Sequence, residues 1–230
     1  MIRKKNLFML LIAVLLFSGM AWAQEAAKID SSYANSHYRM RLDFFRQMPN
    51  LKKEIVFLGN SITEAGEWQE LVPCKPVVNR GISGDVTWGV LARLDEVLAS
   101  KPAKIFLLIG VNDLKRGIST EIISANHRRI LAQIERYSPK TKVILQSVLP
   151  VNEDMLAINY KNINNALIVE LNKRLQVLAG EYGNVTFINL HPTFADSTGQ
   201  LEKGLSTDGL HLKTVAYIKW VEYLRKEKVL

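Results

Sequence analysis

The chain has 230 residues and a formal net charge of +8, with 30 basic and 22 acidic residues. The basic residues are scattered among acidic ones, as in "RLDEVLASKPAK", which argues against nucleic-acid binding. Cys74 is the only cysteine, so the chain cannot form an internal disulfide and must be stabilised by its core. We interpret Cys74 as a small apolar filler.

The first 23 residues have the features of an export signal. Three basic residues at 3–5 precede an apolar run over 7–17, and "AWA" at 21–23 supplies the small-x-small pattern that signal peptidase cleaves. The run is short against the roughly 20 apolar residues of a membrane-spanning helix. We therefore predict a signal peptide at 1–23, one domain at 24–230, and a periplasmic or extracellular protein without a stable membrane anchor after cleavage.

Strands and helices are predicted to alternate along the rest of the chain. Apolar runs rich in β-branched residues predict strands at 54–59, 76–80, 104–110, 142–148 and 185–189. Apolar residues at helical spacing predict helices at 33–47, 86–99, 121–137, 158–179 and 214–224. This alternation predicts a single α/β domain in which helices cover both faces of a five-stranded parallel sheet.

Residues with useful chemistry follow the predicted strands, at the edge where open parallel sheets bind ligands. Ser61 follows the first strand in "FLGNSIT", Gly81 follows the second in "NRGISGD", and Asn112 follows the third in "GVND". Asp208 and His211 lie in "STDGLHL", within the long loop after the fifth strand. We expect these loops to rise at the same edge of the sheet.

These residue types suit acyl transfer. A serine hydroxyl becomes a nucleophile when a base removes its proton, and the imidazole of His211 titrates near working pH. Asp208, three residues earlier, can hold the other ring nitrogen and stabilise the imidazolium. The backbone N–H groups of Ser61 and Gly81 and the side-chain amide of Asn112 can donate to the oxygen that becomes negative on attack.

The blocks "GNSIT", "NRGISGD", "GVND" and "DGLHL" resemble, in order, those of the SGNH/GDSL serine hydrolases, over residues 54–212. The resemblance implies a flavodoxin-like, three-layer αβα fold with Ser61 as nucleophile, His211 as base and Asp208 as its partner. It assigns Gly81 and Asn112 to the oxyanion hole. Gly-Asn precedes Ser61 where the named motif has Gly-Asp, a form closest to the branch of platelet-activating-factor acetylhydrolase-like and carbohydrate O-acetyl esterases.

Other residues allow other interpretations. Asp85 and Asp113 are acids near the expected cleft, as glycoside hydrolysis would need, but we interpret Asp85 as the N-cap of the helix that follows it. His191 is an alternative base without a nearby upstream acid. We expect Trp68 and Trp88 to be core residues rather than pocket walls. The histidines lack metal-ligand spacing and HExxH is absent, so we predict no metal and no cofactor.

The sequence and the resemblance together predict an exported serine esterase that removes short acyl groups, with acetyl on carbohydrate as the favoured substrate. The preference for acetyl and for carbohydrate follows from the resemblance and from the expected location outside the cytoplasm. Two alternatives stay open. One is a phospholipid or lysophospholipid acylhydrolase, and the other is a catalytically silent carbohydrate-binding protein.

Overall fold

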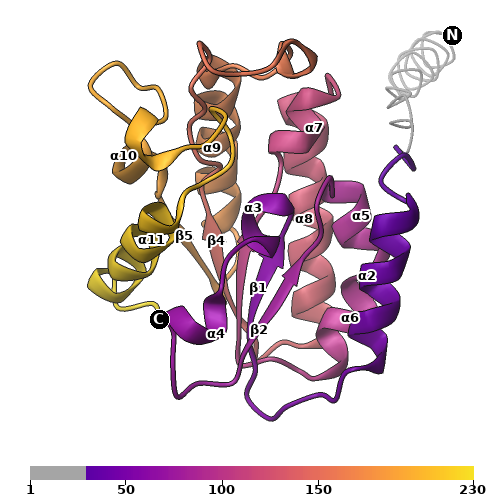
Figure 1. Cartoon of the computed structure of the whole chain (residues 1–230). Coiled ribbons are helices and arrows are strands. Elements are labelled where there is room, and N and C mark those ends of the chain that lie inside the picture. Colours follow the sequence, from indigo (N-terminus) through magenta and orange to yellow (C-terminus); the bar gives the residue numbers. More distant parts are fainter. Residues whose placement is uncertain (1–29) are drawn as a thin grey trace, which may run out of the picture.

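The computed structural model describes residues 30–230, so the predicted signal peptide at 1–23 and the first residues of the predicted domain lie outside it. Five strands form one parallel sheet in the order β2-β1-β3-β4-β5 (Figure 1). This is the strand order of the flavodoxin-like fold. The strands are β1 (Ile55–Gly59), β2 (Val77–Gly81), β3 (Lys104–Leu108), β4 (Lys142–Gln146) and β5 (Val185–Ile188).

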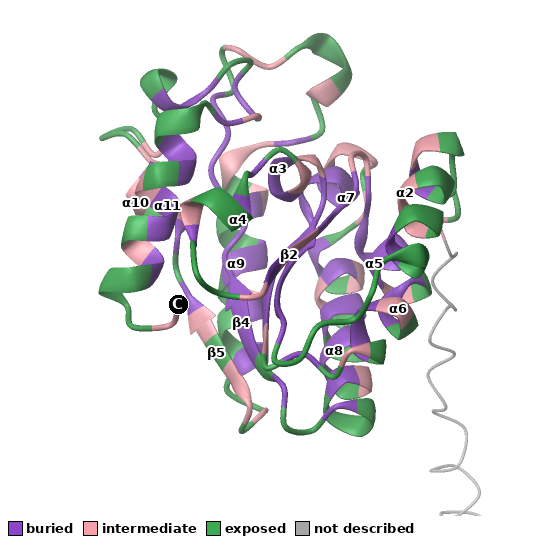
Figure 2. Ribbon diagram, turned by 60° about the horizontal axis from the view of Figure 1, so that its bottom comes forward, coloured by how far each residue is buried: buried purple, intermediate pink, exposed green. Residues whose placement is uncertain are grey.

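The strands are apolar because helices cover both of their faces. All five residues of β1 are buried, as are the last four residues of β3 and of β4. Figure 2 shows this burial, and it also shows the edge strand β5 at intermediate exposure. The predicted five-stranded parallel sheet is therefore confirmed.

Helices form the two outer layers. α5 (Thr87–Ala92), α6 (Leu94–Ala99), α8 (Thr120–Tyr137) and α9 (Asn165–Ala179) lie together on one side (Figure 1). α4 (Trp68–Leu71) lies on the other side, because the crossover from β1 to β2 runs in the opposite direction along the sheet. α11 (Thr214–Lys226), which follows β5, packs beside α4 on that side. The predicted three-layer αβα arrangement is confirmed.

Aromatic side chains join α4 and α11 to the sheet. The ring of Trp68 stacks on Phe57 of β1 with a centroid separation of 3.9 Å. Trp68 also makes edge-to-face contacts with Trp220 and Tyr217 of α11, with centroid separations of 5.0 and 5.8 Å. Trp68 has no exposed surface, so its predicted core role is confirmed, and this packing fixes the segment that follows Ser61.

Three predicted helices differ in their bounds. The helix expected at 86–99 is two helices, α5 and α6, interrupted at Arg93, whose side chain turns into the interior. The helix expected at 158–179 begins only at Asn165, where Asn164 accepts a hydrogen bond from the N–H of Leu167, and residues 158–160 form the short helix η1 (Ile158–Tyr160). The first helix, α2 (Ser36–Gln47), starts after the cap Asn35.

Short helices occupy the strand-to-helix connections. They are α3 (Ser61–Glu64), α7 (Val111–Lys115), α10 (His191–Phe194) and η2 (Lys203–Leu205). The strands end in register, since Gly59 of β1 lies beside Gly81 of β2 and Leu108 of β3. The loops that follow these strands are therefore neighbours. Among residues 30–230, no helix is both long and apolar enough to cross a membrane.

Candidate active site

Ser61 is the first residue of α3, and only Asn60 separates it from the end of β1. Asn60 caps this helix, because its side-chain oxygen accepts the N–H of Ile62 at 3.0 Å. The backbone N–H of Ser61 has no hydrogen-bond partner within residues 30–230. Ser61 thus combines a hydroxyl with an unpaired backbone donor at the start of a helix.

The structure brings Ser61, His211 and Asp208 into one hydrogen-bonded chain. The Ser61 Oγ lies 3.0 Å from the Nε2 of His211, across 150 positions of sequence. The Nδ1 of the same ring lies 2.7 Å from Asp208 Oδ2. The other Asp208 oxygen accepts the N–H groups of Leu210 and His211, at 3.0 and 2.8 Å, so the carboxylate is fixed by its own loop.

The environment of Asp208 favours its charged form. Burial alone would raise the pKa of this carboxyl, but hydrogen bonds from the His211 ring and from the two backbone N–H groups outweigh that effect, and the net pKa is lowered. Asp208 is therefore ionised at neutral pH. An ionised carboxylate at Nδ1 directs the ring's proton to that nitrogen and leaves Nε2 free to accept the proton of Ser61.

Asn112 is buried in the first turn of α7, with 7% of its surface exposed. Its side-chain amide donates one hydrogen bond to the carbonyl of Asp85, at 2.9 Å. The second N–H of the amide has no partner among the described residues. This arrangement fixes the amide and leaves one donor available.

The structure does not support Gly81 as a donor to substrate. Its N–H already donates to Asn79 Oδ1 at 2.9 Å. A Cβ at this position would lie 2.1 Å from the backbone nitrogen of Glu64, so glycine is required here for close packing of α3 on β2. The free N–H in this loop belongs to Gly84, which forms no backbone hydrogen bond through its nitrogen in the part of the chain that the structure describes.

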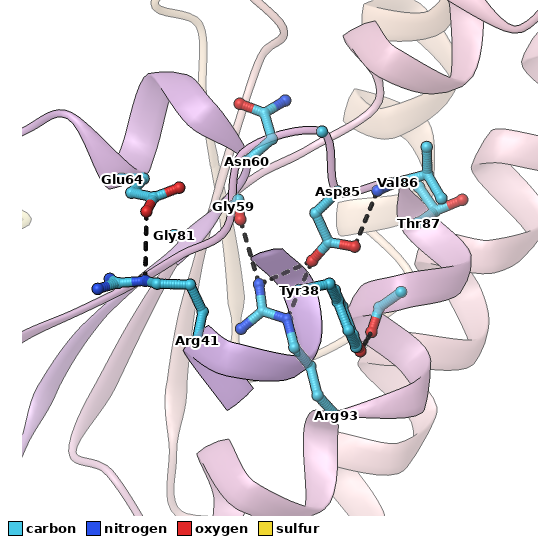
Figure 3. Close-up of polar contacts among 12 residues, drawn as sticks. Tyr38, Arg41, Gly59, Asn60, Glu64, Gly81, Asp85, Val86, Thr87 and Arg93 are labelled. Atoms are coloured by element: carbon cyan, nitrogen blue, oxygen red, sulfur yellow. Dashed lines mark hydrogen bonds and ion pairs between the residues drawn. The ribbon is translucent and has the colours of Figure 1, made fainter. Parts of the chain in front are cut away.

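A buried ion pair joins two of the site's loops, the one that holds Asp85 and the one that begins after Gly59. Asp85 and Arg93 have fully buried side chains with a contact of 2.9 Å between Oδ2 and Nη2, and Arg93 also donates to the carbonyl of Gly59 at 3.1 Å (Figure 3). The prediction that Asp85 is a helix N-cap is wrong: Val86 occupies that position without a side-chain cap. Burial raises the pKa of Asp85 to about 6, although Arg93 pulls it down.

Asp113 is also fully buried and does not face the nucleophile. It accepts the Oγ1 of Thr87 at 2.5 Å, and burial raises its pKa to about 7. Neither Asp85 nor Asp113 is exposed enough to face a substrate gap, which argues against a carboxylate pair for glycoside hydrolysis. His211, and not His191, is the imidazole in contact with Ser61.

Two further predictions concern residues outside the site. Cys74 is exposed, so the prediction that it fills a gap in the core is wrong. Residues 30–230 hold no group of three His, Cys, Asp or Glu side chains arranged to bind a metal ion.

The geometry places an acyl-transfer set at the carboxyl edge of the sheet, and the comparison with known proteins identifies the family. Residues 57–217 match the model of the GDSL-like lipase/acylhydrolase family. The chain belongs to this family. Membership of this lipase/acylhydrolase family identifies the protein as an ester hydrolase.

Individual relatives agree with the family assignment. The platelet-activating factor acetylhydrolase IB subunit alpha2 of Rattus norvegicus is 27% identical over 203 residues, which are 86% of this chain and 83% of that protein. A structure from Streptococcus pneumonia, provisionally described as a platelet activating factor, is 30% identical with a TM-score of 0.79, over 94% of this chain and 98% of that one. A variant of an acetylxylan esterase from Geobacillus stearothermophilus shares the fold, at 19% identity and a TM-score of 0.60, over 77% and 96% of the two chains.

Proposed function

We propose that this GDSL-family hydrolase is an exported serine esterase that releases short acyl groups, acetyl above all, from carbohydrates. The observation that carries the mechanism is the contact chain from Ser61 Oγ to His211 Nε2 at 3.0 Å and from His211 Nδ1 to Asp208 Oδ2 at 2.7 Å. These are the distances of a nucleophile, its base and the group that orients the base. A catalytically silent binding protein would have no need to maintain them.

The reaction proceeds through an acyl-enzyme. His211 takes the proton of the Ser61 hydroxyl as its oxygen attacks the ester carbonyl, and the resulting imidazolium is stabilised by Asp208. Collapse of the tetrahedral intermediate breaks the bond to the alcohol, which leaves with the proton from His211. Water then attacks the acyl-serine with His211 again as the base, and the carboxylic acid is released as Ser61 regains its proton.

Three donors are available for the negative oxygen of the intermediate. They are the backbone N–H of Ser61, the free N–H of the Asn112 side chain, and the backbone N–H of Gly84 in place of Gly81. Gly84 has a φ of +80°, and a Cβ there would meet no atom within 4 Å. Its glycine is required by the backbone conformation that presents this N–H rather than by packing.

The exposure of the triad favours a small acyl group on a large alcohol. The side chains of His211 and Asp208 are 35% and 49% exposed, so the reacting atoms lie near the surface, where an acyl group on a polymer can reach them. The acetylhydrolase relatives support acetyl as the acyl group. Carbohydrate as the alcohol is supported by the resemblance to carbohydrate O-acetyl esterases and by export, which rests on the signal features of residues 1–23. A phospholipid or lysophospholipid acylhydrolase is the alternative.

Chain-length preference tests the acetyl assignment. We expect kcat/KM on p-nitrophenyl esters to fall by at least about 10-fold from acetate to laurate, because a shallow site cannot bury a long chain. Acetylated xylan and O-acetyl sialic acid should release acetate in the same assay. The Ser61→Ala variant serves as the blank for spontaneous hydrolysis. Equal rates across the series, or a preference for laurate, would favour the phospholipid alternative.

A further inference from the structure

The loop at 82–86, between β2 and α5, is held on one side by Glu64. The backbone N–H and the hydroxyl of Ser83 both donate to Glu64 Oε2, at 2.5 and 2.6 Å. Glu64 is the last residue of α3, one helical turn after Ser61. The nucleophile and this half of the loop are therefore tied to the same short helix.

The same loop is held on its other side by Arg116. The Nη2 of Arg116 donates to the carbonyl of Gly84 at 3.0 Å. Arg116 follows α7 directly, four residues after Asn112. The two hydrogen-bonded groups, the N–H of Ser83 and the carbonyl of Gly84, flank the N–H of Gly84 along the backbone, so its direction is fixed from both sides.

Both clamping side chains are themselves held by the N-terminal segment. His37 Nε2 lies 3.1 Å from both oxygens of Glu64, and Arg41 of α2 lies 3.2 Å from Oε1 (Figure 3 draws the Arg41 contact). Asp30 pairs with Arg116 Nη1 at 2.7 Å. These partners hold the Glu64 carboxylate and the Arg116 guanidinium in fixed positions. A side chain must itself be fixed if it is to fix the loop at 82–86.

Polar contacts are needed here because packing cannot supply the restraint. Gly84 has no side chain, and the space around its Cα is open. A glycine in the left-handed region is free to move unless neighbouring groups hold it. Donors of an oxyanion hole contribute most when they are fixed before the reaction, and a displacement of about 1 Å can cost about 100-fold in rate.

We propose that Glu64 and Arg116 are positioning residues that fix the Gly84 N–H between Ser61 and Asn112. The proposal rests on the serine esterase function given above. It treats the loop at 82–86 as the third side of the oxyanion hole, clamped by one charged residue from each neighbouring helix.

Kinetics of four variants test the proposal. We expect Glu64→Leu and Arg116→Met to lower kcat for p-nitrophenyl acetate by about 10- to 100-fold, with KM within about 3-fold of the parent, because the donors act on the transition state. Glu64→Gln can still accept from Ser83, and Arg116→Lys can still donate to Gly84, so both should recover most of the rate. Arg128→Met, which removes an exposed ion pair with Glu181, is the matched control and should keep the parent's kcat.

Thermal unfolding of each variant distinguishes a displaced Gly84 N–H in a folded enzyme from a failure to fold. If Glu64→Leu or Arg116→Met does not fold, Ser83→Ala, which removes only the hydroxyl contact, should still lower kcat several-fold. Folded Glu64→Leu and Arg116→Met enzymes with the parent's kcat would overturn the proposal, as would conservative variants no faster than the disruptive ones. These results leave the esterase function standing, which fails separately if Ser61→Ala retains the parent's rate.

Discussion

The Ser61→Ala enzyme should hydrolyse p-nitrophenyl acetate with a kcat about 10⁴- to 10⁶-fold below the parent, because it lacks the hydroxyl that forms the acyl-enzyme in the proposed mechanism. Residual activity should come from the oxyanion donors alone. Within residues 30–230 the hydroxyl forms a hydrogen bond only with the His211 ring, and Ser61 is partly exposed, so its removal should not disturb the fold. Steady-state kinetics on enzyme purified from a host lacking other esterases provide the measurement.

Circular dichroism and thermal unfolding serve as the control for this variant. Both should match the parent, since the cap of α3 is formed by Asn60 and not by Ser61. A correctly folded Ser61→Ala enzyme with a rate within about 10-fold of the parent would contradict the proposed mechanism. The nucleophile would then have to be sought elsewhere.

The largest expected effect on stability comes from Arg93→Met. The substitution leaves the carboxylate of Asp85 buried without a cation and removes the hydrogen bond to the Gly59 carbonyl. Breaking a buried ion pair in this way costs about 3–5 kcal/mol in the free energy of unfolding. Urea denaturation at pH 8, followed by tryptophan fluorescence, provides the measurement.

The pH dependence distinguishes charge burial from lost packing. Burial raises the pKa of Asp85 to about 6, above the 3.8 of an unperturbed aspartate, so the folded parent loses stability as pH rises through this interval. Without Arg93, which lowers this pKa, the carboxyl should hold its proton to higher pH. The destabilisation by Arg93→Met should therefore be smaller at pH 5 than at pH 8.

Arg128→Met is the control for this comparison. Its ion pair with Glu181 lies in solvent, so the loss should stay within the error of the measurement. If Arg93→Met proved as mild as this control at pH 8, the buried pair would have no role in holding the loops of Gly59 and Asp85 together.

The sheet could be predicted from the sequence because its central strands, β1, β3 and β4, are dominated by buried apolar residues, although the edge strands β2 and β5 also carry polar ones. A short continuous apolar run such as "KIFLL" in β3 is typical of a strand that is buried on both faces of a parallel sheet. The break at Arg93 could not be predicted, since the apolar spacing continues through it. Arg93 instead turns inward to pair with Asp85, eight positions earlier, and with the carbonyl of Gly59, 34 positions earlier, and local helical preference does not reveal such partners.

The triad could be predicted for a similar reason. Strand ends of a parallel sheet meet at one edge, so Ser61 and the Asp208–His211 loop were expected to converge, and the hydrogen bonds agree with that expectation. The choice between Gly81 and Gly84 could not be made in this way. Both stand in "RGISGD", and only the backbone conformation and the hydrogen bond to Asn79 tell them apart.

The proposed positioning roles of Glu64 and Arg116 could not be predicted from the sequence either, because they depend on partners that are distant along the chain. Charged residues at the ends of short helices are common on protein surfaces, and nothing in "SITE" or "DLKR" indicates that either side chain reaches the loop at 82–86. The relevant partners, Ser83 and Gly84, are 19 and 32 positions away along the chain.

Covalent labelling tests the central claim most directly. A fluorophosphonate probe reacts with a serine activated by its base, and the modified residue can be located by peptide mass spectrometry. One adduct per chain on Ser61 is expected, and it should be absent from a folded His211→Ala variant. An enzyme that hydrolyses p-nitrophenyl acetate but carries the adduct on another residue, or carries none, would contradict the assignment of Ser61, His211 and Asp208.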